Sequence, residues 1–182
     1  IFKFLKICGD KASADHEAVE KFIDKFAKVI AYENLTPEQI YNTDETSMLW
    51  RYCPRKTLTT ADETASTGIK DAKDRITVLG CANAAGMHKC KLAVIGKSLS
   101  SLFSEKEFLT SHYYANKKAW ITRNIFSHWF HKRFVPAAHA HCREAGLGED
   151  YKILLFLVNC STDSLAEIFI KNNVYAMYFP PN

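Results

Sequence analysis

Asp44 and Glu45 are the residues whose type and spacing most directly suggest chemistry in this sequence. The two acids are adjacent and lie toward the end of residues 40–46, a stretch with the pattern of a short strand. An acidic pair at the end of a strand can offer a carboxylate oxygen to a divalent cation. The same pair also fits an ordinary turn with solvated side chains, so these residues alone leave both interpretations open.

Histidines form the second candidate. Histidine and cysteine are common zinc ligands, and several occur close together: His128, His131, His139, His141 and Cys142. However, the apolar stripe that includes Trp129 and Phe130 must face the core, and Pro136 divides the group. We therefore interpret these histidines as surface residues and expect no metal site there.

The rest of the sequence lacks the motifs of several common classes of enzyme and of membrane proteins. It contains no glycine-rich phosphate loop, no G-x-S-x-G nucleophile elbow and no H-E-x-x-H zinc motif. No apolar run approaches the roughly 18 residues that a membrane-spanning helix needs, so we expect no membrane partner. The six cysteines include no C-x-x-C pair, which favours a reducing compartment such as the cytosol or nucleus.

The net charge of +4 is too small to indicate nucleic-acid binding by itself. Basic residues nevertheless gather in two parts of the chain. The first group is Arg51, Arg55, Lys56, Lys70, Lys73, Arg75, Lys89, Lys91 and Lys97, and the second is Lys117, Lys118, Arg123, Lys132 and Arg133. Solvated faces of strands and helices are the simplest explanation of both groups.

Hydrophobic periodicity predicts both helices and strands. Helices are expected at residues 13–30, 122–134, 137–145 and 164–172, with Pro136 breaking or kinking the chain between the second and third. Strands are expected at 40–46, 75–82, 91–95, 153–158 and 174–179, with an irregular connection at 96–114. Thr36 and Gln39 predict a capping box. Hairpin strands followed by strands that alternate with helices predict a mixed α/β sheet with helices on its faces.

Several blocks of the sequence are similar to one known family. In chain order they are YNTDET (41–46), DRITVLGCAN (74–83), VIGKS (94–98), NKKAWIT (116–122), FVP (134–136), LVNC (157–160) and FPPN (179–182). Together they resemble the pogo/Tigger/jerky group of DDE transposases, to which centromere protein B is also related. Seven blocks in the right order are far more specific than any single motif.

The resemblance implies a ribonuclease-H-like mixed α/β sheet with helices on its faces, truncated here at its C-terminus. In that family three carboxylates surround two divalent ions, which activate the attacking oxygen and stabilise the leaving oxygen at phosphorus. The first acid corresponds to Asp44. The adjacent Glu45 is a further candidate metal ligand from the acidic pair alone. The second position, an aspartate in the family, is Val158 here, and the third lies beyond Asn182.

Val158 departs from the family pattern at a position that matters for catalysis. A valine side chain has no lone pair for a metal, and we assign the nearby Asp163 to a helix entrance because Ser164 and Glu167 predict a helix start. With Asp44 as the single certain ligand, a two-ion centre should not assemble. We therefore expect no cofactor, and Mg²⁺ or Mn²⁺ only if some activity remains.

The family resemblance and the valine at position 158 together predict a transposase-derived, DDE endonuclease-like domain. Such a domain is expected to bind DNA in the nucleus and to be catalytically inactive. Two alternatives stay open: a residual divalent-metal-dependent DNA endonuclease, and a non-functional remnant of a decayed transposable element. Contacts to DNA, independent of its sequence, are expected from Arg51, Arg55, Lys56, Lys97, Lys117, Lys118 and Arg123.

The predicted organisation has two parts. Residues 1–36 are expected to form a helical lead-in, and residues 37–182 the DDE-type domain, incomplete at its C-terminal end. The family usually carries helix-turn-helix modules upstream, which would hold any sequence-specific DNA recognition. The resemblance also allows a homodimer or other nuclear proteins as partners.

Overall fold

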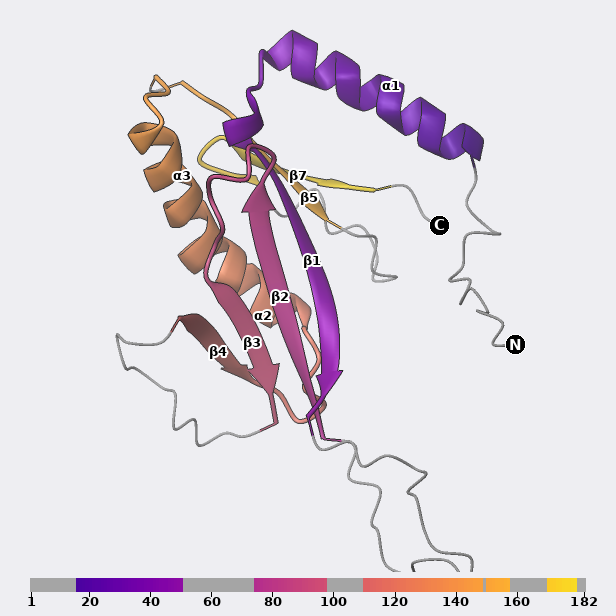
Figure 1. The fold of residues 1–182 in the computed structure, drawn as a ribbon, viewed down its shortest axis with the longest axis vertical. Coiled ribbons are helices and arrows are strands. Elements are labelled where there is room, and N and C mark those ends of the chain that lie inside the picture. The colour runs from indigo at the N-terminus through magenta and orange to yellow at the C-terminus, as the bar shows by residue number, and fades with distance from the viewer. Residues whose placement is uncertain (1–15, 51–73, 98–109, 149, 158–169, 180–182) are drawn as a thin grey trace, which may run out of the picture.

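The computed structural model describes residues 16–50, 74–97, 110–148, 150–157 and 170–179 of the chain. Its centre is a seven-stranded sheet in the order β4-β3-β2-β1-β5-β7-β6, with helices on its faces (Figure 1). The strands are β1 (Ile40–Leu49), β2 (Arg75–Asn83), β3 (Leu92–Gly96), β4 (Ser111–Ala115), β5 (Ile153–Leu157), β6 (Ile170–Lys171) and β7 (Val174–Tyr178). The helices are α1 (His16–Glu33), the short 3₁₀ turn η1 (Pro37–Gln39), α2 (Arg123–Trp129), the π turn η2 (Phe130–Phe134) and α3 (Val135–Glu144).

Strand directions confirm the predicted fold class. β1 and β2 are antiparallel, as are β2 and β3, whereas β5 runs parallel to β1 and β7 runs parallel to β5. The central order β3-β2-β1-β5-β7 with these directions is that of a ribonuclease-H-like sheet. β4 adds a parallel strand beside β3, and β6 forms a hairpin with β7 at the other edge.

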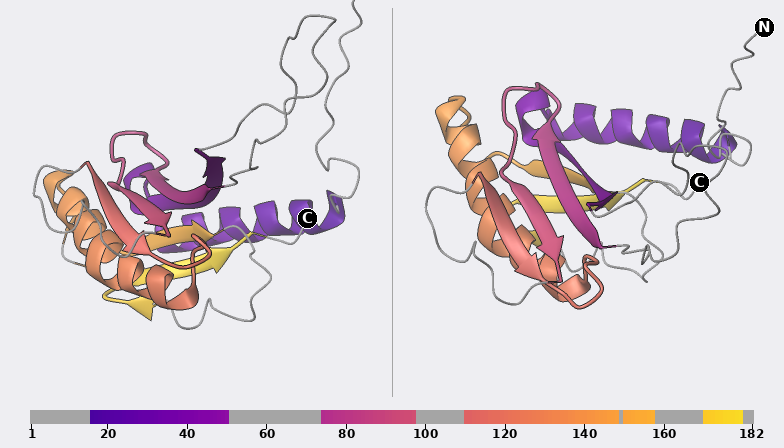
Figure 2. Two further views of the ribbon diagram at one scale, coloured as in Figure 1. Left: turned by 90° about the horizontal axis from the view of Figure 1, so that it is seen from below. Right: turned by 60° about the horizontal axis from the view of Figure 1, so that its bottom comes forward.

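One face of the sheet is closed by the continuous helical layer α2–η2–α3 (Figure 2). Trp129, Phe130 and Phe134 lie in this layer and are at most 1% exposed. The ring of Phe134 stacks on Trp129 at 5.4 Å and meets the ring of Tyr41, from β1, edge to face at 5.2 Å. Burial of these rings makes this side the main hydrophobic core, since each contributes about 1.5–3 kcal/mol.

The opposite face is covered more narrowly, by α1. Phe26 meets Phe156 of β5 edge to face at 4.8 Å, and Phe22 lies 6.0 Å from the same ring. The apolar cluster under α1 also includes Ile40 and Leu154, so it lies over β1, β5 and β7. Among the described residues, no helix covers β2, β3 and β4 on this face (Figures 1 and 2).

Local sequence signals explain the entry into β1. The side chain of Gln39 accepts a hydrogen bond from the Thr36 backbone N–H at 2.9 Å, so the predicted capping box is confirmed. The Gln39 amide also donates to the Lys152 carbonyl at 2.8 Å, which ties this turn to the start of β5. Asn34 ends α1 in the left-handed region with φ 49°, as asparagine often does after a helix.

Three sequence expectations need correction. Residues 111–115 form β4, although an irregular connection was expected there. Of the two outcomes expected at Pro136, a break is wrong, because the π turn lets the Val135 N–H bond to the Phe130 carbonyl and places Pro136 in the first turn of α3. The helix expected to reach residue 172 lies mostly outside the described residues, and its end is wrong because Ile170 and Lys171 form β6.

Candidate functional site

Asp44 lies on β1, on the sheet face opposite the α2–η2–α3 layer. Side chains alternate along a strand, so the buried Tyr41 and Thr43 point into the main core and Asp44 points the other way. The Asp44 side chain is exposed, and its Oδ1 accepts a hydrogen bond from the Glu45 backbone N–H at 2.8 Å. Its partner across β2 is Gly80, which leaves the space beside the carboxylate open.

The described residues do not provide a metal centre around Asp44. They contain no group of three histidine, cysteine, aspartate or glutamate side chains that could hold an ion. β5 is described as far as Leu157, which pairs with Thr43 next to Asp44. The next residue in the sequence, Val158, and the later Asp163 both lie outside the described residues. A single exposed carboxylate pair does not fit the two-ion centre that the family resemblance implies.

The sheet brings the predicted basic residues toward one end. β1, β3, β4, β5 and β7 all run in one direction, so the segments that follow them leave the sheet at the same end. The Asn116 N–H donates to the Gly96 carbonyl at 2.8 Å, and Thr77 Oγ1 donates to the Ala119 carbonyl at 2.7 Å. These bonds hold the turn containing Lys117 and Lys118 beside the end of β3.

Four of the seven predicted DNA-contacting residues belong to this end of the sheet. Lys97 follows β3, Lys117 and Lys118 follow β4, and Arg123 begins α2; all four are exposed. The remaining three, Arg51, Arg55 and Lys56, lie outside the described residues. The structure therefore brings to one end of the sheet basic residues as far apart in the sequence as Lys97 and Arg123, which are separated by 26 positions.

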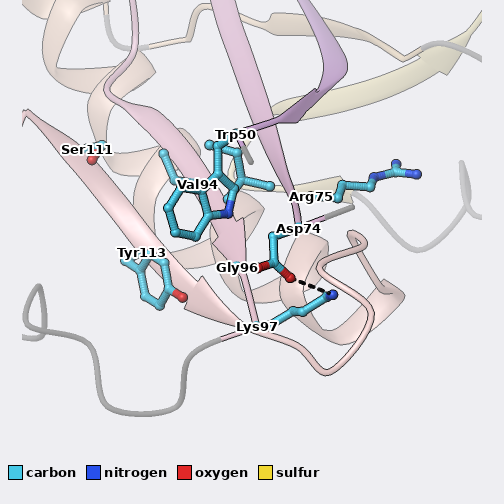
Figure 3. A pocket seen from close by; sticks show the side chains of 9 residues that line it. Trp50, Asp74, Arg75, Val94, Gly96, Lys97, Ser111 and Tyr113 are labelled. Carbon is cyan, nitrogen blue, oxygen red and sulfur yellow. Dashed lines mark hydrogen bonds and ion pairs between the residues drawn. The ribbon is translucent and has the colours of Figure 1, made fainter. Parts of the chain in front are cut away.

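An open pocket of about 650 Å³ lies at the same end, on the face that no described helix covers (Figure 3). Its walls include Trp50, Val94 and Tyr113, and its rim includes Lys97, whose Nζ lies 3.3 Å from Asp74 Oδ1. Gly96 permits this arrangement, because a Cβ there would collide with the Tyr113 hydroxyl. The pocket thus combines apolar walls with an ion pair at its edge.

A hydrogen-bonded cluster that the sequence did not reveal lies at the other end of the sheet. Glu38 Oε2 is 2.6 Å from both His141 Nε2 and Asn83 Nδ2, and Tyr41 Oη is 2.7 Å from His88 Nδ1. The His88 and His141 rings stack at 4.5 Å. Burial, and then the charge of His141, lower the pKa of His88. The cluster joins η1, β2 and α3, so its role is structural.

His139 also differs from the expectation of a surface residue. Its Nδ1 is 2.8 Å from the Tyr151 hydroxyl, and its Nε2 is 2.9 Å from the Asn172 carbonyl oxygen. His128 is exposed, as the interpretation as surface residues predicted, whereas His131, His139 and His141 are half-buried. The partners of His139 and His141 come from distant segments, which no local pattern identifies. Burial raises the pKa of the neighbouring Cys142 to about 11, which keeps its thiol protonated.

Comparison with known families identifies the domain type. Residues 73–182 match the family model described as DDE superfamily endonuclease. The chain belongs to this family. The match begins after β1, so Asp44 lies outside it, although the sheet places β1 between β2 and β5.

Two similar proteins align with nearly the whole of this chain. The human Jerky protein homolog is 40% identical over 179 residues, covering 98% of this chain and 32% of that protein. The human Tigger transposable element-derived protein 7 is 34% identical over 185 residues, covering 97% of this chain and 34% of that protein. The chain thus spans about a third of the length of these relatives.

One solved structure has a weak overall likeness. It is the Mos1 transposase paired-end complex with the left transposon end, with a TM-score of 0.49 and 7% identity over 96% of this chain and 46% of that one. Membership in the DDE superfamily endonuclease family does not depend on this comparison. Within the described residues, no helix is long and apolar enough to cross a membrane.

Proposed function

We propose that this DDE-family chain is a transposase-derived DNA-binding domain that does not cleave DNA. The observation that carries the proposal is the residue that follows β5. Leu157 pairs with Thr43 beside Asp44, and the next residue in the sequence is Val158, where the family resemblance expects the second acid. Valine cannot bind a cation, so a divalent ion near Asp44 would lack a ligand that a two-ion mechanism needs.

DNA binding is supported by the end of the sheet at which five strands finish. Lys97, Lys117 and Lys118 are exposed there, and Lys97 also lines the pocket that contains Trp50 and Tyr113. Lysine side chains bind phosphates without reading bases, so contacts through this end would be independent of sequence. Under this proposal the domain acts in the nucleus. A homodimer and nuclear protein partners stay predictions from the family resemblance.

Nicking of supercoiled plasmid in the presence of Mn²⁺ tests the catalytic part. Wild type and Asp44→Asn should show the same background, because neither carries a complete set of metal ligands. Asp150→Asn is the matched control, since it removes another exposed acid, between α3 and β5. Nicking by wild type and Asp150→Asn that disappears in Asp44→Asn would establish the residual endonuclease instead.

Binding to a duplex of about 20 base pairs at low salt tests the DNA part. Affinity should fall steeply as the salt concentration rises, because bound lysines release counterions from the phosphates. Absence of binding at low salt would refute DNA association. A non-cooperative urea transition together with no binding would favour the decayed remnant, whereas a single cooperative transition is expected for a folded domain.

A further inference from the structure

A second group of positive charge lies on the helical side of the sheet, away from Asp44. Residues 108–143 contain no aspartate or glutamate, but they contain six lysines and arginines and five of the seven histidines. Three of the six, Lys117, Lys118 and Arg123, belong to the end of the sheet described above, and the other three follow in the helical layer. The net charge of the whole chain is only +4, so the rest of the sequence is slightly acidic. Such asymmetry within one domain indicates a surface for a negatively charged partner.

The structure places part of this charge between α2–η2 and the edge strand β4. The Tyr114 hydroxyl of β4 is 3.3 Å from His128 Nδ1 of α2. Burial raises the pKa of Tyr114, and the nearby positive charge of Arg133 opposes this shift. Burial, and then the positive charges of Arg133, Lys91 and His128, lower the pKa of His112. The basic side chains of β4 and of the helical layer, and Lys91 just before β3, therefore lie near one another.

The other edge of the sheet adds further positive charge. Burial, and then the charges of Lys171 and Lys132, lower the pKa of His131. Lys171 belongs to β6, so the curled sheet brings both of its edge strands beside the same helical layer (Figure 2). The charges that lower the pKa of His112 and of His131 are positive.

We define the helix-side basic surface as Lys91, His112, His128, Lys132, Arg133 and Lys171. Its helical residues are exposed, whereas Trp129, Phe130 and Phe134 of the same layer point into the core. Within the described residues, α2, η2 and α3 expose no large hydrophobic side chain. Protein interfaces usually need an apolar or aromatic anchor, whereas a phosphate backbone needs only regularly placed cations. The chemistry of this surface therefore favours a nucleic acid over an acidic protein.

We propose that the helix-side basic surface binds the phosphate backbone of a DNA duplex, as a second contact surface distinct from the end of the sheet near Asp44. The inference rests on the proposed DNA binding and adds a surface to it. Neighbouring cations repel one another, and phosphates would relieve this repulsion. The domain would then contact DNA through two faces, one at the strand ends and one on the helical layer.

Three charge-matched triple variants test the proposal by duplex binding at several salt concentrations. The helix-side triple is Lys132→Gln, Arg133→Gln and Lys171→Gln. The strand-end triple is Lys97→Gln, Lys117→Gln and Lys118→Gln. The control is Lys21→Gln, Lys25→Gln and Lys28→Gln, which removes the same charge from exposed positions of α1. Far-UV circular dichroism and urea unfolding establish that each variant is folded.

The helix-side triple should lower the slope of log affinity against log salt by about 2 to 3, since each lost phosphate contact removes about 0.9. The α1 triple should leave the slope close to wild type, although its net charge is identical to that of the other triples. Arg133→Lys should retain the wild-type slope, because the phosphate contact requires the charge and not the guanidinium shape.

Other outcomes separate this proposal from the proposed function. A helix-side triple with the slope of the α1 triple overturns the second surface, and DNA binding stands if the strand-end triple still lowers the slope. Wild type that does not bind duplex at low salt overturns both. Binding to polyglutamate that is lost in the helix-side triple, with DNA binding unchanged, overturns the choice of nucleic acid and assigns the surface to an acidic protein.

Discussion

The two faces of the central sheet differ in how completely helices cover them. On one face α2–η2–α3 seals Tyr41, Trp129 and Phe134 into a core that excludes water. On the other, α1 covers β1, β5 and β7, and the described residues leave Asp44 and the pocket beside Trp50 exposed. An exposed carboxylate such as Asp44 therefore lies on the face with incomplete cover, because a buried unpaired carboxylate would be costly.

Because of this difference in cover, substitutions on the sealed face should affect stability, whereas substitutions on the open face should affect binding. Removing a side chain from the sealed face creates a cavity, whereas removing one from the open face leaves a site that water can fill. The outside of the helical layer is solvated and can carry charge without affecting the core beneath it. Substitutions that compare matched positions on the two faces can test this division directly.

The largest expected difference is between two tryptophans. Trp129→Ala should lower the free energy of unfolding by about 3–5 kcal/mol, because Trp129 is 1% exposed and its ring stacks on Phe134. Trp120→Ala should cost about 1 kcal/mol, because Trp120 is 55% exposed and its main contact is with the Arg75 guanidinium, 4.9 Å from the ring centre. Urea unfolding measures both values, and equal losses would contradict the comparison.

A smaller difference is expected between two charged groups. Glu38→Ala should lower the free energy of unfolding by about 1–3 kcal/mol, because it leaves the buried Asn83 amide and His141 without their shared acceptor. Lys97→Gln on the open face should change it by less than about 1 kcal/mol, since its contact with Asp74 is solvated. A larger loss in Lys97→Gln would show that the pocket rim is part of the core.

The smallest expected effect is that of pH on stability. The pKa values of His88, His112 and His131 are lowered, mainly by burial, so the unfolded chain binds more protons than the folded one as the pH falls through about 6.5. The free energy of unfolding should therefore decrease between about pH 7.5 and pH 5.5.

Substitution identifies the groups responsible for this pH dependence. The double variant His112→Gln and His131→Gln should show a shallower decrease in the same urea titrations, since it keeps only the contribution of His88. Stability that stays constant or rises on acidification of wild type would contradict the assigned burial of these histidines.

Patterns within single segments predicted most of the elements. The apolar stripe through Trp129 and Phe134 predicted a helix, and the capping box of Thr36 and Gln39 formed as expected. The hairpin of β2 and β3 and the fully buried β5 were also predicted, because alternation and apolar runs are local properties. The family resemblance rested on separate short blocks of sequence, which are local as well.

Features that depend on distant partners were missed. β4 contains His112, Tyr113 and Tyr114, a short segment without clear alternation, and it becomes a strand because β3 offers a free edge to pair with. Likewise, nothing near Glu38 in the sequence indicates that it will meet His141 and Asn83. The pairing of Thr43 with Leu157 is also a result of folding. It brings the described end of β5 next to the strand that carries Asp44, and Val158 is the next residue in the sequence.

The sequence by itself therefore determined the type and order of the main elements and the family, and it has a valine at position 158, where the family resemblance expects an acid. Only the tertiary structure decided that Asp44 faces an incompletely covered side of the sheet, that Lys97 approaches the turn of Lys117 and Lys118, and that both edge strands flank α2–η2. The physical reason is that strand pairing and curvature arise from hydrogen bonds between segments far apart in the chain, which no local periodicity encodes.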